Sequence, residues 1–285
     1  MSRYAYVNGQ YLPLSVAGVH IEDRGYQFAD GIYEVIAVHQ GCLVDEEAHL
    51  VRLSRSLHEI ELAWPVSKAV LKHILRRMIA INLLKNGILY LQITRGVTRR
   101  DHAFPKPGVT PSLVVTAKTM KPTPPEMIER GVAVVTMPDQ RWKRCDIKSV
   151  ALLPNILSKQ AAKLKGAYEA WLIDEKGFVT EGSSTNAWIV TGKGEIVTRP
   201  LGTPILAGVT RLAILTLAKE AGLKLVERPF KPAEALKARE AFLTSTTSWA
   251  LPITRIDGKP VGSGKPGPIT LRLRQLYAEA LDKGL

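Results

Sequence analysis

The sequence predicts a mixed α+β fold that is divided into two domains. The chain has 285 residues, which is enough for about two compact units. Segments with the alternation typical of strands are mixed with segments of helical periodicity in both halves. Between the halves, residues 118–126 (KTMKPTPPE) contain three prolines and predict an irregular linker. We therefore expect a small N-terminal domain over 1–118, a linker over 119–130 and a larger C-terminal domain over 131–285.

The first half begins with a hairpin signal. Asn8 and Gly9 stand between two short runs of strand-forming residues, and this dipeptide suits a type I′ turn. Apolar residues then recur at helical spacing from Glu47 and again from Ser67, which predicts two helices. Further strands are expected at 31–38, 41–44, 88–95 and 112–117.

The second half mixes predicted strands and helices. Strands are expected at 132–137, 169–174, 186–190, 195–198, 224–228 and 240–244. Helices are expected near 151–165, 210–221, 231–237 and 268–283. Gly166 and Gly222 follow two of these helices, where glycine favours the left-handed cap that ends a helix.

The composition is that of a globular chain. Apolar residues make up 46% and charged residues 23%, which excludes disordered and collagen-like proteins. The longest apolar stretches fall far short of the roughly 20 residues that a membrane span needs, and the N-terminus lacks the apolar region of a secretory signal. Cys42 and Cys145 are far apart in the sequence, so we expect neither a metal site nor a disulfide framework. A cytoplasmic protein is expected.

The formal net charge of +13 indicates an anionic partner. The basic residues are spread along the chain, and the densest group, Arg95, Arg99 and Arg100, has neither a nucleic-acid motif nor interleaved aromatic residues. A small anionic substrate uses the same electric field and is the favoured interpretation. We expect no nucleic-acid partner and no membrane partner.

Residues that can carry chemistry stand in six stretches. They are 27–35 (QFADGIYEV), 49–53 (HLVRL), 144–149 (RCDIKS), 181–186 (EGSSTN), 205–211 (ILAGVTR) and 243–248 (LTSTTS). Taken singly, each has an ordinary interpretation: Lys148 as a solvated lysine, Glu181 as a turn residue, Arg52 as a helix-surface arginine. Together and in this order they resemble the class IV, fold-type IV aminotransferases, which use pyridoxal 5′-phosphate. The resemblance covers residue 21 to the C-terminus and is nearest to the D-amino-acid aminotransferases of that class.

The resemblance implies a role for each cofactor-binding residue. Lys148 would form the Schiff base with the cofactor aldehyde and act as the catalytic base, in preference to Lys143 or Lys159. Glu181 would keep the proton on the pyridine nitrogen, without which the ring is a poor electron sink. The cofactor site would lie at the interface of the two domains, where ligand sites are common.

The cofactor phosphate needs a cation and converging N–H donors. The resemblance assigns the cation to Arg52. Val209 and Thr210 follow Gly208 at a predicted helix start, where N–H groups and the helix dipole suit a phosphate; the alternative is that these residues only cap the helix. Ser245 and Thr246 complete the phosphate site by resemblance, or form a plain hydroxyl-rich turn.

The loop after the strand at 88–95 discriminates among members of the class. Arg100 and His102 are similar to the arginine and histidine with which D-amino-acid aminotransferases bind the substrate carboxylate, and Tyr33 matches the tyrosine that joins them. A guanidinium can bind a carboxylate through two parallel hydrogen bonds. Because Arg99 precedes Arg100, the register of the binding arginine is open by one residue, and an exposed basic loop is the alternative.

The function expected from this resemblance is transamination of D-amino acids, with 2-oxoglutarate or pyruvate as acceptor. A branched-chain L-amino-acid aminotransferase, an (R)-amine transaminase or an aminodeoxychorismate lyase of the same class remain alternatives. A basic nucleic-acid-binding protein or a non-enzyme that carries pyridoxal phosphate is the alternative from another class. The resemblance also implies that the protein is a homodimer and that it binds amino acids and 2-oxo acids as small-molecule partners.

Overall fold

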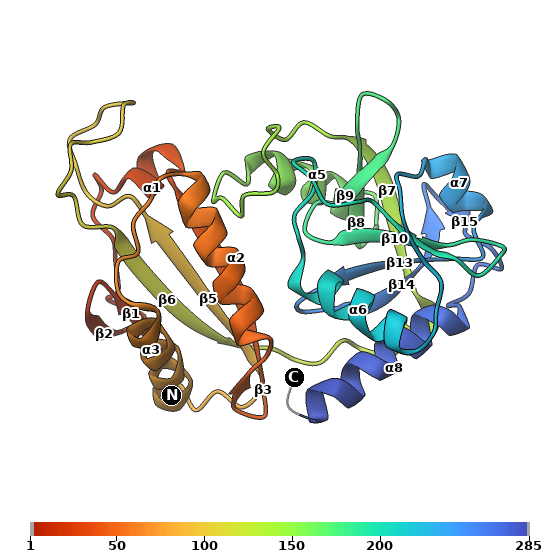
Figure 1. Ribbon diagram of the computed structural model, residues 1–285, viewed down its shortest axis with the longest axis horizontal. Helices are drawn as coiled ribbons and strands as arrows, with labels where there is room; N and C mark the ends of the chain where they lie inside the picture. The colour runs from red at the N-terminus through yellow and green to blue at the C-terminus, as the bar shows by residue number, and fades with distance from the viewer. Residues whose placement is uncertain (1–2, 284–285) are drawn as a thin grey trace. The chain divides into compact units, whose positions relative to one another are not determined.

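The computed structural model describes residues 3–283, which divide into two compact units (Figure 1). The first unit contains the chain up to Lys121 together with Ile147–Ala151, and the second contains Pro122–Asp146 and the chain from Leu152 onward. Both units combine helices with a sheet, so the predicted α+β fold is confirmed. The predicted division placed all of 131–285 in one domain, whereas the segment that carries Lys148 packs with the first unit.

An antiparallel six-stranded sheet forms the first unit, in the order β2-β1-β6-β5-β3-β4. The strands are β1 (Tyr4–Val7), β2 (Gln10–Pro13), β3 (Gly31–His39), β4 (Cys42–Leu43), β5 (Gly87–Thr94) and β6 (Ser112–Thr119). The helices are α1 (Arg24–Phe28), α2 (Glu46–Glu59) and α3 (Lys68–Ile81). Apolar side chains of α2 and α3 share one core with alternate residues of β3, β5 and β6. The alternation leaves Tyr33 on the opposite face of β3 from the helices.

The local signals in the first half are confirmed. Asn8 and Gly9 both have positive φ, 45° and 97°, as a type I′ turn requires, and they join β1 to β2. Ser67 caps α3 by accepting a hydrogen bond from the Val70 N–H. The short helix α1 was not predicted; Asp23 caps it through the N–H of Gly25.

The second unit is built on a mixed nine-stranded sheet, in the order β12-β11-β10-β13-β14-β7-β8-β9 with β15 paired to β14. The strands are β7 (Val132–Pro138), β8 (Glu169–Ile173), β9 (Val179–Gly182), β10 (Asn186–Val190), β11 (Ile196–Thr198), β12 (Leu225–Glu227), β13 (Glu240–Ser245), β14 (Trp249–Ile256) and β15 (Lys259–Pro260). The helices are α4 (Pro125–Arg130), α5 (Leu153–Leu164), α6 (Val209–Glu220), α7 (Pro232–Lys237) and α8 (Pro268–Asp282).

One expectation, that of an irregular linker, is wrong, and some strands of the second half were missed. The segment 119–130, predicted to be irregular, contains α4. The prolines do not prevent this helix, because Pro125 stands in its first turn, where a missing N–H costs nothing. Strands β9, β14 and β15 were not predicted.

Among residues 3–283, no helix is both long and apolar enough to cross a membrane.

Candidate active site

Lys148 is fixed beside the first residues of β3 by main-chain hydrogen bonds. Its carbonyl accepts from the Tyr33 N–H at 3.0 Å, and the Val150 N–H donates to the Gly31 carbonyl at 3.0 Å. The Lys148 N–H donates to the Ser56 hydroxyl of α2 at 3.3 Å. The Lys148 Nζ then lies 4.3 Å from the centre of the Tyr33 ring. The structure therefore brings the predicted cofactor lysine together with the predicted substrate tyrosine.

The competing lysines have ordinary surroundings. Lys143 is exposed. The Lys159 ammonium donates to the Tyr168 carbonyl at 2.5 Å and lies 3.6 Å from the buried Glu169 carboxylate, so it serves as a structural ion-pair partner. Neither geometry suggests a lysine reserved for a cofactor.

Arg52 is a buried arginine, and its interpretation as a surface residue is wrong. Its Nε and Nη2 each donate to the Glu34 carboxylate at 2.7 Å, and His49 Nδ1 lies 2.8 Å from the same carboxylate. Burial would raise the pKa of Glu34, but Arg52 and His49 outweigh it and bring this pKa to about 2. Burial lowers the pKa of His49, so the neutral ring donates its Nδ1–H to Glu34. The pairing fixes the direction of the Arg52 guanidinium; its role toward a phosphate stays a prediction.

Sequence reasoning missed Glu34, although a signal exists. In β3 the buried residues Ile32, Ile36 and Val38 alternate with partly exposed ones, and Glu34 occupies a position of the buried face. A charged residue at a position that the alternation buries needs a partner, and Arg52 and His49 supply it.

We expect Glu34→Gln to lower the free energy of unfolding at pH 7 by about 3 kcal/mol. The lowered pKa of Glu34, about 2 against 4.5, corresponds to roughly this amount, and the variant leaves Arg52 buried without its counter-charge. Because the folded-state pKa is depressed, this stabilisation is present above about pH 4.5 and is lost as the pH falls toward 2. Urea unfolding at pH 7 and at pH 3 measures both effects.

The control is Glu46→Gln, which removes a surface ion pair with Arg76 and should cost less than about 1 kcal/mol. Equal losses in the two variants, or a Glu34→Gln loss that is unchanged at pH 3, would contradict the assignment of a buried ionised Glu34.

Glu181 lies on β9 of the second unit with its carboxylate buried among donors. It accepts hydrogen bonds from Arg141 Nη1, from Asn186 Nδ2 at 3.0 Å and from the Leu206 N–H at 3.1 Å. Burial raises the pKa of the Glu181 carboxyl, and the Arg141 charge opposes this rise. The role of Glu181 toward a pyridine nitrogen stays a prediction.

Arg141 was not identified from the sequence. Its Nε and Nη2 donate to Asp139 at 2.9 and 2.8 Å, and Nη2 also donates to the Pro204 carbonyl at 3.1 Å. Burial would lower the pKa of Arg141, but Asp139 and Glu181 raise it beyond its usual range, so it is a permanent cation. In the sequence Arg141 stands among other basic residues, 141–144 (RWKR), and nothing distinguishes it.

The start of α6 lies next to the Glu181 group. Gly208 precedes the helix without a side-chain cap, and a Cβ there would lie 2.1 Å from Asn186 Oδ1. Glycine is therefore required for this close approach. Val209 and Thr210 follow and are buried. Asn186 therefore contacts both Gly208, at the start of α6, and Glu181, which it reaches by a hydrogen bond.

Ser245 and Thr246 lie at the turn between β13 and β14. The Ser245 hydroxyl lies 2.7 Å from the Ser248 hydroxyl and accepts from the Ser248 N–H at 3.2 Å, so the hydroxyl-rich turn exists. In the sheet register Asn186 pairs with Thr244, which places Ser245 one residue beyond this pair. Binding of the cofactor by Ser245 and Thr246 stays a prediction.

Arg100 and His102 lie on the exposed loop between β5 and β6 and flank one aromatic ring. The guanidinium carbon of Arg100 lies 4.9 Å from the centre of the Phe28 ring, and the His102 ring centre lies 5.4 Å from it. Tyr33 stacks on Tyr90 with ring centres 5.7 Å apart. Among residues 3–283 there is no hydrogen bond or ring contact between Tyr33 and either loop residue. The structure brings Arg100 together with His102, and Tyr33 together with Lys148.

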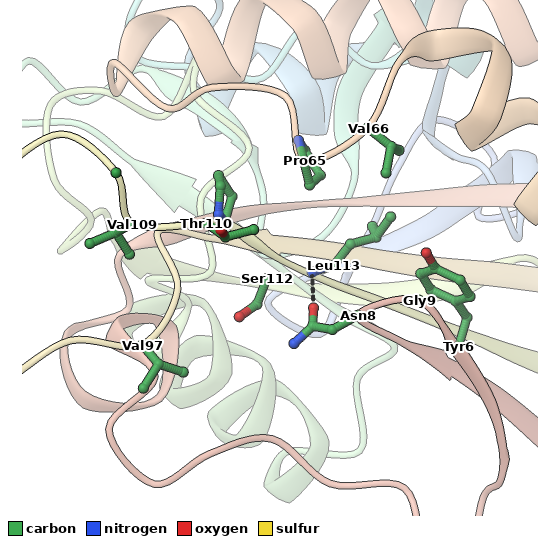
Figure 2. A pocket seen from close by; sticks show the side chains of 12 residues that line it. Tyr6, Asn8, Gly9, Pro65, Val66, Val97, Val109, Thr110, Ser112 and Leu113 are labelled. Atoms are coloured by element: carbon green, nitrogen blue, oxygen red, sulfur yellow. Dashed lines mark hydrogen bonds between the residues drawn. The ribbon is translucent and has the colours of Figure 1, made fainter.

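A pocket of about 700 Å³ lies where the two ends of this loop approach the β1–β2 turn (Figure 2). Val97 comes from the start of the loop, and Val109 and Thr110 come from its end. The Leu113 N–H, in β6, donates to Asn8 Oδ1 at 2.7 Å and so connects β6 to the β1–β2 turn. The remaining lining residues are Tyr6, Gly9, Pro65, Val66, Gly108, Pro111 and Ser112. No predicted site residue lines this pocket, and its side chains offer no cation for a carboxylate.

The described side chains match the needs of one cofactor. Lys148 has the amine that an aldehyde requires, Glu181 has a buried carboxylate of the kind that a ring nitrogen requires, and the uncapped start of α6 has N–H groups suited to a phosphate. These residues fit pyridoxal 5′-phosphate, and the assignment of each of them to the cofactor stays a prediction.

The chain belongs to the amino-transferase class IV family, whose model matches residues 31–256. The D-alanine aminotransferase of Bacillus licheniformis is 45% identical over 264 residues, 92% of each chain. That of Staphylococcus aureus (strain MSSA476) is 39% identical over 278 residues, 97% of each chain. These matches confirm the predicted family, the aminotransferase class of enzyme and pyridoxal 5′-phosphate as its cofactor.

Solved structures of the same fold are also similar. The branched-chain amino acid aminotransferase of Escherichia coli has a TM-score of 0.89 at 24% identity, with 98% of this chain and 94% of that chain covered. The branched-chain aminotransferase of Thermoproteus uzoniensis, solved with norvaline, has a TM-score of 0.86 at 24% identity, with the same coverage. At this identity the likeness shows the fold alone, and it confirms fold-type IV.

Proposed function

We propose that this protein transfers the amino group of D-amino acids to a 2-oxo acid, 2-oxoglutarate or pyruvate. The observation that carries the proposal is the pairing of Arg100 and His102 on Phe28, a cation and an imidazole presented together on an exposed loop. The relatives named D-alanine aminotransferases, 39–45% identical over nearly the whole chain, support it.

Each group of residues contributes one part of the reaction. Pyridoxal 5′-phosphate, when bound, supplies an electron sink for the pair of electrons that the departing α-proton leaves behind. Lys148 would hold the cofactor aldehyde, and its free amine would be the base that removes the α-proton of the substrate and carries it to the aldehyde carbon of the cofactor. Glu181 would hold the proton on the ring nitrogen, and Arg141, which donates to the same carboxylate, favours its ionised form.

The remaining predicted residues bind and orient. Arg52 and the N–H groups of Val209 and Thr210 would bind the phosphate, with the hydroxyls of Ser245 and Thr246 completing the set. Lys148 and Glu181 belong to different units and serve one cofactor in this proposal. A position of the cofactor between the two domains stays a prediction.

The substrate carboxylate is bound by Arg100, with His102 and Tyr33 as further donors. Charge-assisted hydrogen bonds to a carboxylate contribute roughly 1.5–3 kcal/mol each. A fixed carboxylate determines which hydrogen of the α-carbon faces the Lys148 amine. In this way the loop selects the D-enantiomer.

We expect Arg100→Ala to lower kcat/KM for D-alanine about tenfold to a hundredfold, because one charge-assisted contact is lost. An (R)-configured primary amine without a carboxylate should be affected far less. Stopped-flow measurement of the cofactor spectrum in the half-reaction gives both values. Arg99→Ala is the matched control, and its D-alanine half-reaction should be close to that of the wild type.

The proposal fails if Arg100→Ala and His102→Ala leave the D-alanine half-reaction untouched. It also fails if the wild type reacts faster with L-leucine than with any D-amino acid, which would favour a branched-chain L-amino-acid aminotransferase. A large effect of Arg99→Ala in place of Arg100→Ala would move the binding arginine by one residue.

A homodimer is part of the same proposal. Leu153, Ile156 and Leu157 are 66%, 59% and 57% exposed and share one face of α5. An apolar stripe of this kind is typical of a surface that another chain covers. Light scattering at working concentration should give twice the mass of the chain, and a fully active monomer would contradict the proposal. The cytoplasmic location stays a prediction.

A further inference from the structure

Two buried arginines share one carboxylate next to the proposed substrate-binding loop. The Asp30 Oδ2 atom accepts from Arg24 Nε at 2.7 Å and from Arg95 Nε at 2.8 Å. The side chains of Arg24 and Arg95 are only 4% and 8% exposed. Since a guanidinium has five N–H groups in a planar fork, each arginine keeps donors for other acceptors after it has bound Asp30.

The two arginines use these donors on different main-chain segments. Arg24 Nη1 donates to the Asp101 carbonyl at 2.5 Å, and its Nη2 donates to the His102 carbonyl at 3.3 Å. Arg95 donates instead to the carbonyls of Ile60 and Glu61 at the end of α2. Arg24 therefore binds the loop main chain at Asp101 and His102, directly after Arg100 in the sequence.

The Phe28 ring orients the side chains of the same loop residues. Its centre lies 4.8 Å from the Arg24 guanidinium carbon and 4.9 Å from that of Arg100, and the His102 ring packs beside it. Arg24 and Phe28 are four residues apart in α1, so they lie on one side of this helix. One element thus holds the loop main chain through Arg24 and its side chains through Phe28.

Helix α1 is itself a rigid support. A Cβ at Gly25 would lie 2.2 Å from the Thr94 side chain, so the helix packs tightly on the end of β5. Asp23 accepts from the Thr94 hydroxyl at 2.9 Å and caps the helix with its other oxygen. The loop, in contrast, is exposed from Arg99 to Phe104. An exposed loop depends on such anchors for its conformation, and the Phe104 ring, whose centre lies 3.7 Å from the Arg95 guanidinium carbon, provides a second one at the end of this segment.

We infer that Arg24, oriented by Asp30, is a positioning residue that determines how Arg100 and His102 are presented to the substrate carboxylate. This inference rests on the proposed function of Arg100 and His102. Without Arg24, two carbonyls lose charge-assisted donors and the loop samples more conformations. Substrate binding must then order the loop, and apparent affinity for the carboxylate falls.

The inference predicts a split between KM and kcat. Arg24→Gln should raise KM for D-alanine about tenfold and leave kcat within about threefold, because the lost contact contributes to binding of the carboxylate more than to the proton transfer. The rate with an (R)-configured primary amine should change less than about twofold. Arg24→Lys keeps the charge without the planar fork and should fall between Arg24→Gln and wild type.

A second measurement does not depend on activity. The peptide bonds after Arg99 and Arg100 are tryptic sites on the loop. Limited trypsin digestion of the folded protein should cleave there several times faster in Arg24→Gln than in wild type, since local opening controls such cleavage. Arg76→Gln, which removes a surface ion pair with Glu46, is the matched control and should change neither kinetics nor cleavage.

A double-mutant cycle separates positioning from a general structural role. In an Arg100→Ala/His102→Ala background, Arg24→Gln should have less than about a twofold effect on KM, because the groups that it positions are gone. If the full Arg24→Gln effect persists there, or if D-alanine and the amine lose rate by the same factor, the inference is overturned. Unchanged cleavage of the loop in Arg24→Gln also overturns it. If Arg24→Gln does not fold, the kinetic comparison and the trypsin digestion are both made with Arg24→Lys.

The failure of the inference is distinguishable from failure of the proposed function. A wild type that does not react with D-amino acids refutes the proposed function, whatever the loop does. A wild type that reacts with D-amino acids while Arg24→Gln keeps its KM refutes only the positioning role of Arg24.

Discussion

Lys148→Ala is expected to abolish transamination and the covalent attachment of the cofactor. One amine must both anchor the aldehyde and move the α-proton, and the Lys148 Nζ lies 4.3 Å from the centre of the Tyr33 ring. Borohydride reduction should fix the yellow cofactor to the wild type and not to the variant. The variant should still bind the cofactor without a covalent bond through its phosphate contacts.

Lys159→Ala is the control for this prediction. Its ammonium pairs with Glu169 in the second unit, so its loss should leave the half-reaction close to normal. A near-normal half-reaction in Lys148→Ala together with a loss in Lys159→Ala would show that the identification of the cofactor lysine is wrong.

Glu181→Gln is expected to slow the half-reaction by a factor of about 10²–10³, roughly 3–4 kcal/mol of barrier. The amide cannot hold the proton on the pyridine nitrogen, so the electron sink is lost. The cofactor should still bind, because the start of α6 is unchanged. Single-turnover rates with D-alanine and a cofactor titration by absorbance measure the two properties. An unchanged rate would remove Glu181 from the site.

Arg141 provides a pH-dependent test of the same group. Its charge lowers the pKa of Glu181 against the rise that burial causes, so Arg141→Met should raise this pKa further. Because the ionised carboxylate is the active form, the acid limb of the kcat/KM profile should move to higher pH. Arg228→Gln, which loses a surface pair with Glu234, should leave the profile in place. An unshifted acid limb in Arg141→Met would contradict the role of Arg141.

Most of the fold could be predicted because its signals are local. The Asn8-Gly9 turn and the helical spacing from Glu47 and from Ser67 each depend on residues close in sequence, and each is found. Strand β14 was not predicted, and it contains Pro252, which has no N–H to donate and therefore argues against a central strand. The structure nevertheless places β14 between β13 and β7, with a register shift after Ile253.

The sequence by itself determined the family, the cofactor and the candidate residues for binding it. Lys148 and Glu181 stand in motifs whose residue types the chemistry requires, so order and spacing were sufficient to single them out. Only the tertiary structure decided which other charged residues support them. Arg141 and Arg24 look in the sequence like any surface charge, and Glu34 differs from one only by its position in the alternation of β3. Each gains its importance because folding buries it, and in a medium of low dielectric constant a buried charge must have partners. Those partners lie on distant segments of the chain or on turns whose geometry no local pattern encodes.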